Sequence, residues 1–493
     1  MKVRGIKTNF IFNIIGPLLS LVVMLIATPI YIWHIGNARF GLLSITWGLL
    51  GYFGFLDLGL SQASANALAK LGDPSSGEER AKVLTTVLWV NLCMGIVGGL
   101  IFYFSGSFII EHLLTVPADL KPEIDTAFPW IASVLPLALV GGIGYGALES
   151  RERFLAANVL QVVGSTVGVV APVICAVYIS PSLTLVIPAA VIARLLSVML
   201  ALGFALRGES HLSPWGFDWK RARALLSYGG WVSIATITGQ ILASVDQLVI
   251  GAVLGVAAVA YYAVPVSLVL RSQLLAAALS RTLFPRMSRF TPAEAKGLAQ
   301  KALVTLAYAY GAICGSAIVL ARPLLELWMG KDFGSIAGPI ADLLFIGGWA
   351  NGLFSIFFVL LQGQGRPDIV AKVNSFGLIP YIILLWFLVS RFGLLGAGGA
   401  WDLMVTSVTG IVFAAARFHP ARLVQLVPPL GFVLAAYLYV CIWPPGILGA
   451  FLVAGVVAAS ACAGAMVFDP YTRQFVTSMR FPKHFQRASK RAS

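Results

Sequence analysis

Long apolar runs dominate this sequence, and short breaks containing charged residues, Pro or Gly separate them. Most runs reach the ~20 residues that an α-helix needs to span about 30 Å of hydrocarbon. Lipid offers no partner to exposed backbone groups, so helices are the expected element. The runs are continuous, whereas the strands of an outer-membrane β-barrel alternate. The pattern predicts an all-α integral membrane protein.

The pattern accommodates about fourteen membrane-spanning helices. The predicted spans are residues 10–34, 40–66, 83–109, 126–149, 155–179, 184–206, 226–253, 258–281, 302–328, 339–363, 373–390, 397–416, 424–442 and 447–468. The composition agrees, with 59% hydrophobic residues, a mean hydropathy of +0.89 and 11% charged residues. Soluble domains carry about 25% charged residues. A soluble protein is therefore excluded.

Lys and Arg are distributed unevenly over the ends of these spans. One set of ends carries 27 of the 34, the other set carries four, and three lie within spans. Positive charge marks the cytoplasmic side. Both chain ends fall on the basic side, which predicts cytoplasmic termini and an even number of crossings. The first apolar run follows a basic segment but is too long for a signal peptide and lacks a convincing cleavage site.

Three short segments recur at an offset of about 214 to 217 residues. The pairs are 31–41 with 248–258, 108–111 with 324–326, and 148–158 with 362–374. A repeated six-helix unit gives two parallel lobes related by an axis along the membrane normal. The predicted domains are an N-terminal six-helix lobe (1–206), a cytoplasmic linker (207–225), a C-terminal six-helix lobe (226–420), additional helices 13 and 14 (421–468) and a basic cytoplasmic tail (469–493).

Catalytic, metal and cofactor chemistry has no candidate residues. The five cysteines lie inside apolar runs without CxxC spacing, and the five histidines have no spacing for a metal site or a proton relay. No Asp-x-Asp motif, phosphate-binding Gly loop or nucleophile triad occurs. We expect no metal, no cofactor and no enzyme activity. The basic residues are spread over many short loops, so nucleic-acid binding is not expected either.

Several short motifs resemble one family of membrane transporters. They are Pro29-Ile30-Tyr31, Phe40-Gly41-Leu42, Gly51-Tyr52-Phe53, Leu56-Asp57-Leu58-Gly59-Leu60, Asp246-Gln247-Leu248-Val249-Ile250-Gly251, Phe284-Pro285-Arg286-Met287-Ser288, Pro323-Leu324-Leu325 and Gln362-Gly363-Gln364-Gly365-Arg366. The sequence resembles the multidrug/oligosaccharidyl-lipid/polysaccharide exporter superfamily over spans 1 to 12. Within it, the Wzx-type flippases of lipid-linked O-antigen repeat units are most similar.

The resemblance implies two lobes that rock between inward-open and outward-open states around a cavity formed largely by spans 1, 2, 7 and 8. Drug exporters of this group have twelve spans and an acidic cavity. The flippases have two more helices and a more cationic cavity. Fourteen predicted spans and several intramembrane arginines favour a flippase here.

Arg271 and Arg194 lie inside apolar spans, where a charge costs about 2.5 to 3.5 kcal/mol even by insertion measurements. Arg271 lies 13 residues after the predicted outer start of span 8, about 20 Å deep. A guanidinium binds a diphosphate well. We expect Arg271, with Arg194 as a second candidate, to bind the diphosphate of a polyprenyl-linked sugar. An internal ion pair or snorkelling is the alternative for each.

Asp57 in span 2 and Asp246 in span 7 belong to helices that the resemblance places at the cavity. Either carboxylate is a candidate for coupling transport to a proton or cation gradient, or for gating. The alternative is a structural role, in which Asp57 bonds backbone groups or a loop arginine.

The sequence thus predicts a flippase in the bacterial inner membrane that moves polyprenyl-diphosphate-linked oligosaccharides outward for surface polysaccharide assembly. Its expected partners are the lipid-linked oligosaccharide and membrane lipids, with other polysaccharide-assembly proteins left open. A cation-coupled multidrug exporter, a lipid II flippase and, from another class, a membrane enzyme of polysaccharide assembly are the alternatives.

Overall fold

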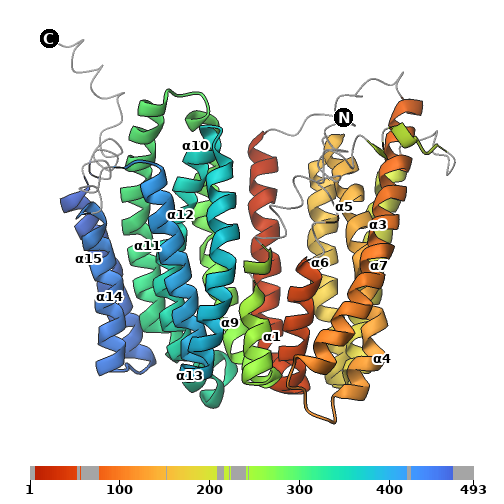
Figure 1. Cartoon of the computed structure of the whole chain (residues 1–493), viewed down its shortest axis with the longest axis horizontal. Coiled ribbons are helices and arrows are strands. Elements are labelled where there is room, and N and C mark those ends of the chain that lie inside the picture. Colours follow the sequence, from red (N-terminus) through yellow and green to blue (C-terminus); the bar gives the residue numbers. More distant parts are fainter. Residues whose placement is uncertain are drawn as a thin grey trace. The chain divides into compact units, whose positions relative to one another are not determined.

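A computed structural model describes residues 6–52, 56, 77–151, 153–207, 216–220, 222–223, 240–242, 244–418, 424–469 and 473. Within these ranges every regular element is a helix (Figure 1). The helices are α1 (Ile6–Tyr52), α3 (Gly77–His112), α4 (Lys121–Ala132), α5 (Val134–Ser150), α6 (Phe154–Tyr178), α7 (Leu183–Leu206), α9 (Val256–Ser272), α10 (Leu274–Met287), α11 (Pro292–Met329), α12 (Lys331–Gly363), α13 (Pro367–Ala415), α14 (Val427–Ile442) and α15 (Ile447–Phe468). The predicted all-α class is confirmed.

Ten helical stretches in the described part of the chain are long and apolar enough to cross a membrane. A shorter apolar helix, Ser244–Val253, lies where the sequence predicts the end of span 7. The protein is therefore a multi-pass membrane protein. The count of fourteen crossings stays a prediction.

Two long helices contain a break at a glycine with positive φ. In α1 the break is at Gly36 (φ 81°, ψ 161°), and in α13 it is at Gly393 (φ 59°, ψ −138°). Glycine adopts such angles without the steric cost that a Cβ imposes. Both breaks coincide with predicted turns, between spans 1 and 2 and between spans 11 and 12.

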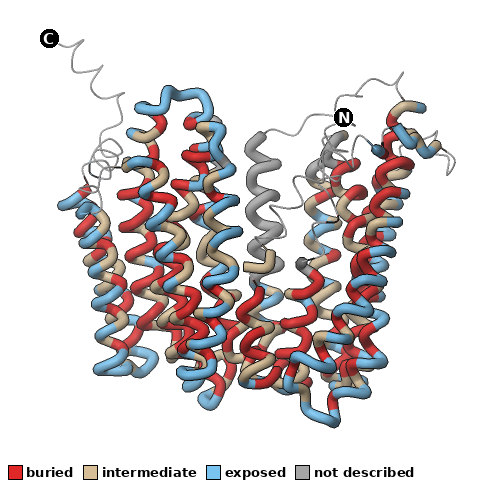
Figure 2. The backbone as a smooth tube through the Cα atoms, in the orientation of Figure 1, coloured by how far each residue is buried: buried red, intermediate tan, exposed pale blue. Residues whose placement is uncertain are grey.

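The chain divides into two compact units, Met1–Ala260 and Tyr261–Ser493, called unit 1 and unit 2 below. In unit 2, α12 packs against α11 and α13, and α14 and α15 pack against α11 (Figure 1). In their most apolar windows, 61% of residues are buried in α11 and 67% in α12, against 17% in α13 (Figure 2). α11 and α12 thus form the core of unit 2.

In unit 1, α6 packs against α7 and α1, and α5 packs against α3 and α7. The connection after α3 is joined to the start of α9 through Thr115. Its backbone N–H donates to the Gly251 carbonyl (3.2 Å), and its carbonyl accepts from the Val256 N–H (3.4 Å). Its hydroxyl donates to the Ala252 carbonyl (3.1 Å). These bonds fix the turn before α9. The predicted lobe and linker boundaries stay predictions.

Candidate transport site

The eighth predicted span is interrupted in unit 2, where α9 ends at Ser272 and α10 begins at Leu274. Tyr310 of α11, which is fully buried, fills the interruption. Its hydroxyl donates to the Ser272 carbonyl (2.9 Å) and accepts from the Ala276 N–H (3.3 Å). A side chain from a neighbouring helix thus supplies hydrogen bonds at the break. Broken membrane helices of this kind often line transport sites.

Arg271 is in the last turn of α9, directly before this interruption, and is partly exposed. The carbonyl ends of a helix favour a positive charge. The planar guanidinium presents a fork of N–H groups that suits phosphate oxygens. The position at the end of α9 thus accommodates the positive charge of Arg271, and its role in binding an anion stays a prediction.

Gln273, two residues after Arg271, connects two helices. Its side-chain Nε2 donates to the Gly348 carbonyl of α12 (3.0 Å). Polar side chains commonly bridge membrane helices in this way. Gln273 therefore ties the interrupted helix to the core of unit 2.

Arg194 lies on α7 in unit 1 and is exposed. On an α-helix, residues three, four and seven positions away share a face. The residues of the Arg194 face, Ile187, Val191, Val198 and Ala201, are all buried. The backbone of Arg194 therefore lies on the packed side of α7, although its side chain is exposed. Arg194 and Arg271 belong to different units.

The structure describes only one of the two aspartates predicted from the sequence. Asp246, in the helix Ser244–Val253, is 2% exposed, and its Oδ1 accepts from the Gln247 N–H (2.8 Å). A backbone contact of this kind fits a structural role as well as a coupling role. Asp57 lies outside the described residues.

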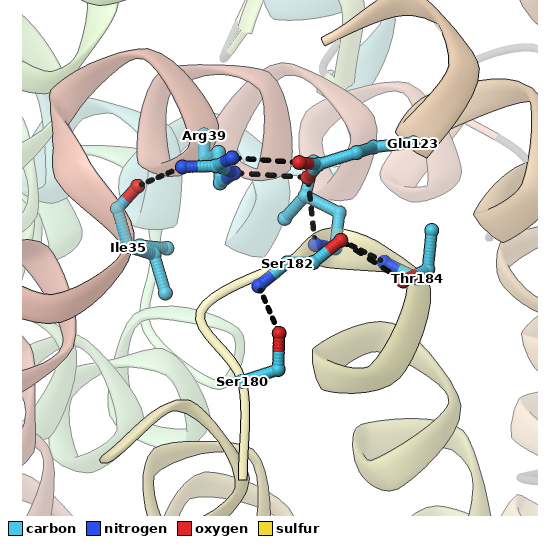
Figure 3. Close-up of polar contacts among 7 residues, drawn as sticks. Ile35, Arg39, Glu123, Ser180, Ser182 and Thr184 are labelled. Carbon is cyan, nitrogen blue, oxygen red and sulfur yellow. Dashed lines mark hydrogen bonds and ion pairs between the residues drawn. The ribbon is translucent and has the colours of Figure 1, made fainter.

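A charged network that the sequence does not reveal joins α1, α4 and α7 in unit 1 (Figure 3). Arg39 donates through Nε (2.9 Å) and Nη2 (2.6 Å) to the two carboxylate oxygens of Glu123. Glu123 also accepts from the Leu183 N–H (2.9 Å), and Arg39 donates to the Ile35 carbonyl (3.3 Å). The Glu123 carboxylate raises the pKa of the Arg39 guanidinium. The pair is 84 residues apart, so no local pattern indicates it.

Two intramembrane carboxyl groups of unit 2 were also missed. Asp342 lies on α12 and is 4% exposed, and Asp402 lies on α13 and is partly exposed. Each Oδ1 is buried and has no hydrogen-bond partner among the described residues. The available signal was a carboxylate inside each predicted span, 339–363 and 397–416. Intramembrane carboxylates are candidate functional residues by that position alone.

Known proteins share both sequence and fold with this chain. A putative O-antigen transporter from Shigella flexneri is 25% identical over 402 residues, covering 81% of this chain and 95% of the relative. The lipopolysaccharide biosynthesis protein WzxC from Escherichia coli K12 is 25% identical over 395 residues, covering 78% of this chain and 74% of the relative.

Solved structures show the same fold. The lipid II flippase MurJ in an inward closed conformation gives a TM-score of 0.74 at 14% identity, covering 95% of this chain and all of that chain. A multidrug resistance MATE family transporter of the MOP superfamily, in an inward-facing conformation, gives a TM-score of 0.67 at 15% identity. The match covers 83% of this chain and 99% of that chain. The resemblance inferred from the short motifs is confirmed. A model of the family described as polysaccharide biosynthesis protein matches residues 35–337, well over half of the sequence, and the chain therefore belongs to that family.

Proposed function

We propose that this protein is a flippase that moves polyprenyl-diphosphate-linked oligosaccharide repeat units across the bacterial inner membrane for surface polysaccharide assembly. The match to the polysaccharide biosynthesis family over residues 35–337 carries the proposal. A relative named as an O-antigen transporter, of which this chain covers 95%, supports the substrate class. The protein acts as a transporter and not as an enzyme.

The proposed layout has fourteen crossings, with both termini in the cytoplasm. Residues 1–206 and 226–420 form two six-helix lobes joined by the linker 207–225. Helices 13 and 14 within 421–468 correspond to α14 and α15. The asymmetric distribution of Lys and Arg supports this orientation. Residues 469–493 form a basic tail on the cytoplasmic side.

In the proposed mechanism the lipid-linked substrate enters from the inner leaflet and its diphosphate binds Arg271. The position of Arg271 before the interruption between α9 and α10 supports this role. Arg194 is a second cationic contact. The lobes then rock, and the substrate leaves toward the outside. Asp246 and Asp57 are proposed coupling or gating residues.

Loss of Arg271 tests the diphosphate role. Arg271→Ala removes charged hydrogen bonds to the substrate, so we expect transport to fall roughly tenfold or more. Arg271→Lys keeps the charge and should retain partial activity. The measurement is the amount of surface polysaccharide in a strain whose own flippase is deleted, complemented with each variant.

Arg391→Ala is the matched control, because Arg391 is an exposed arginine of α13. Wild-type polysaccharide levels with a stably inserted Arg271→Ala protein would rule out the diphosphate role.

A cation-coupled multidrug exporter is the alternative with the same fold, since a MATE transporter shares it with a TM-score of 0.67. A drug exporter should raise resistance to cationic dyes and leave polysaccharide assembly unrestored. A lipid II flippase is the second alternative, because MurJ shares the fold with a TM-score of 0.74. The lipid-linked intermediate that accumulates in the uncomplemented strain separates these substrates.

A further inference from the structure

A groove on α13 has no part in the transport mechanism above. It has a volume of about 480 Å³. Its lining residues belong to two stretches of α13, 372–384 before the break at Gly393 and 403–411 after it. The chain turns back at this break, so the two stretches form opposite walls of the groove. The whole groove lies within unit 2.

The walls of the groove are mainly apolar. The lining residues recur every three or four positions, which is the spacing of one helical face. Before the break the series is Val373, Gly377, Pro380 and Leu384, and after it the series is Met404, Val408 and Ile411. Two large lining side chains are strongly exposed, Phe376 at 80% and Leu403 at 53%. Exposed apolar side chains of a membrane span contact lipid, so a lipid chain is the expected occupant.

A glycine makes the groove hollow near its middle. A Cβ added to Gly377 would meet no atom within 4 Å, so open space lies beside this part of the backbone. Gly377 lies five residues after Lys372 and seven before Leu384, or about 7.5 Å and 10.5 Å along the helix. A lipid chain in the groove would therefore pass a point where the wall carries no side chain.

The length of the groove corresponds to one leaflet of the membrane. Lys372 and Leu384 are twelve residues apart, or about 18 Å along the helix. One leaflet contributes about 15 Å of hydrocarbon, which is half of the ~30 Å core. In the proposed layout the start of α13 is cytoplasmic. The groove therefore lies mainly in the inner leaflet.

The cytoplasmic end of the groove carries positive charge. The Lys372 ammonium donates to Asp368 Oδ2 (2.9 Å), and an ammonium has further N–H groups for a ligand. Its methylene stem can line the apolar wall while the charged end reaches water. Arg366, at the N-cap of α13, adds a second cation. This end suits a phosphate group, which anionic lipids present at the cytoplasmic surface.

We infer that this groove binds one anionic glycerophospholipid of the inner leaflet. One acyl chain lies between the two stretches of α13, and the phosphate lies at Lys372. A zwitterionic lipid fits less well, because its ammonium group is repelled by Lys372 and Arg366. The polyprenyl chain of the proposed substrate is longer than the groove, whereas an acyl chain fills one leaflet. Lipid binding does not depend on the transported substrate, and only the choice of leaflet rests on the proposed layout.

Native mass spectrometry of the purified full-length protein in detergent tests the headgroup preference. Dioleoyl-phosphatidylglycerol or dioleoyl-phosphatidylethanolamine is titrated, and the apparent Kd of the first bound lipid is measured. We expect the wild-type protein to bind phosphatidylglycerol about fivefold more tightly. Lys372→Gln should remove most of this preference. Asp368→Asn removes the carboxylate that competes with the phosphate for Lys372, so it should increase the preference.

Gly377→Leu tests the chain-binding part of the groove. The leucine side chain occupies the open space, so both lipids should bind about tenfold more weakly. Ser407→Leu narrows the groove from the opposite wall and provides the same test if Gly377→Leu fails to fold. Gly431→Leu on α14 is the matched control, because a Cβ there also meets no atom within 4 Å and the residue lies outside the groove. Lys301→Gln, at an exposed lysine of α11, is the control for charge.

Four results would overturn the inference. The first is equal affinity of the wild-type protein for the two lipids, and the second is unchanged affinity in both Gly377→Leu and Ser407→Leu. The third is displacement of phosphatidylglycerol by equimolar polyprenyl phosphate, which would assign the groove to the substrate chain. The fourth is a protein dimer that Gly377→Leu disrupts, which would assign the groove to a second copy. Failure of the wild-type protein to restore polysaccharide would contradict the flippase function and leave this lipid site standing, because binding is measured on the purified protein.

Discussion

The Arg39–Glu123 pair of unit 1 and two aspartates of unit 2, Asp342 and Asp402, show opposite surroundings for acidic side chains in one protein. Glu123 is 18% exposed and accepts bonds from Arg39 and from the backbone of Leu183. Asp342 is 4% exposed, and its Oδ1 has no partner among the described residues. The first carboxylate is saturated with donors, and the second keeps an oxygen open.

This difference separates a carboxylate that holds helices together from one that does so only weakly. A carboxylate whose lone pairs are occupied by a guanidinium and a backbone N–H has little to offer a ligand. It holds three helices together at one place. A buried carboxyl group with an open oxygen contributes little to holding helices. The comparison therefore predicts opposite effects of mutation on stability.

The largest effect is expected for Glu123→Ala. The substitution leaves the Arg39 guanidinium, 26% exposed, without its carboxylate partner. The pair is only part-buried, so losing its charged hydrogen bonds costs about 1.5 to 3 kcal/mol. The measurement is thermal unfolding of the purified protein in detergent, compared with the exposed control Glu78→Ala. Equal unfolding temperatures for the two variants would contradict a structural role of the pair.

Gly347→Ala should have an intermediate effect. Its Cβ would meet Asp402 Oδ1 and the Trp401 ring, so α12 and α13 must shift. Overpacking of this kind costs about 1 to 3 kcal/mol. Gly399→Ala is the matched control on α13, because a Cβ there meets no atom within 4 Å. Thermal unfolding that does not distinguish the two variants would show that Asp402 is not confined at this glycine.

The smallest effect, and one of opposite sign, is expected for Asp342→Asn. This change replaces a carboxyl group that is costly to ionise where it lies, and it keeps the shape of the side chain. We expect the protein at neutral pH to be unchanged or more stable by up to about 1 kcal/mol. Thermal unfolding beside Glu123→Gln, which should be destabilised, tests the sign. A loss of stability for Asp342→Asn as large as that for Glu123→Gln would remove the distinction between the two pairs.

Much of the fold was predictable because membrane helices follow local rules. Gly36 and Gly393 mark breaks in α1 and α13 where short interruptions of apolar sequence predict turns. The interruption of the eighth span at Gln273 was not predictable, because Tyr310 of another helix supplies its hydrogen bonds. The sequence of an apolar run shows how long a helix can be. It does not show which side chain of a neighbouring helix supplies hydrogen bonds at an interruption.

For the candidate site, too, the sequence shows which charges lie within spans, and only the structure shows their partners. Arg271 was visible in the sequence, because a charge inside an apolar span stands out whatever surrounds it. The same rule applied to Asp342 and Asp402, yet it does not say which intramembrane charges are satisfied. Arg322 is also an intramembrane charge, and the structure pairs it with Glu326 one turn away. Only the partners of each side chain distinguish these cases.

The sequence by itself determined that this protein is an all-α membrane protein of a polysaccharide biosynthesis family, with cationic residues inside its spans. Hydrophobic length and charge position are properties of single segments, so they can be read along the chain. The tertiary structure decided that Arg39 pairs with Glu123, and that Asp342 and Asp402 each have a buried oxygen without a partner among the described residues. Those contacts join helices distant in sequence, and hydrogen bonding depends on distances that only packing sets.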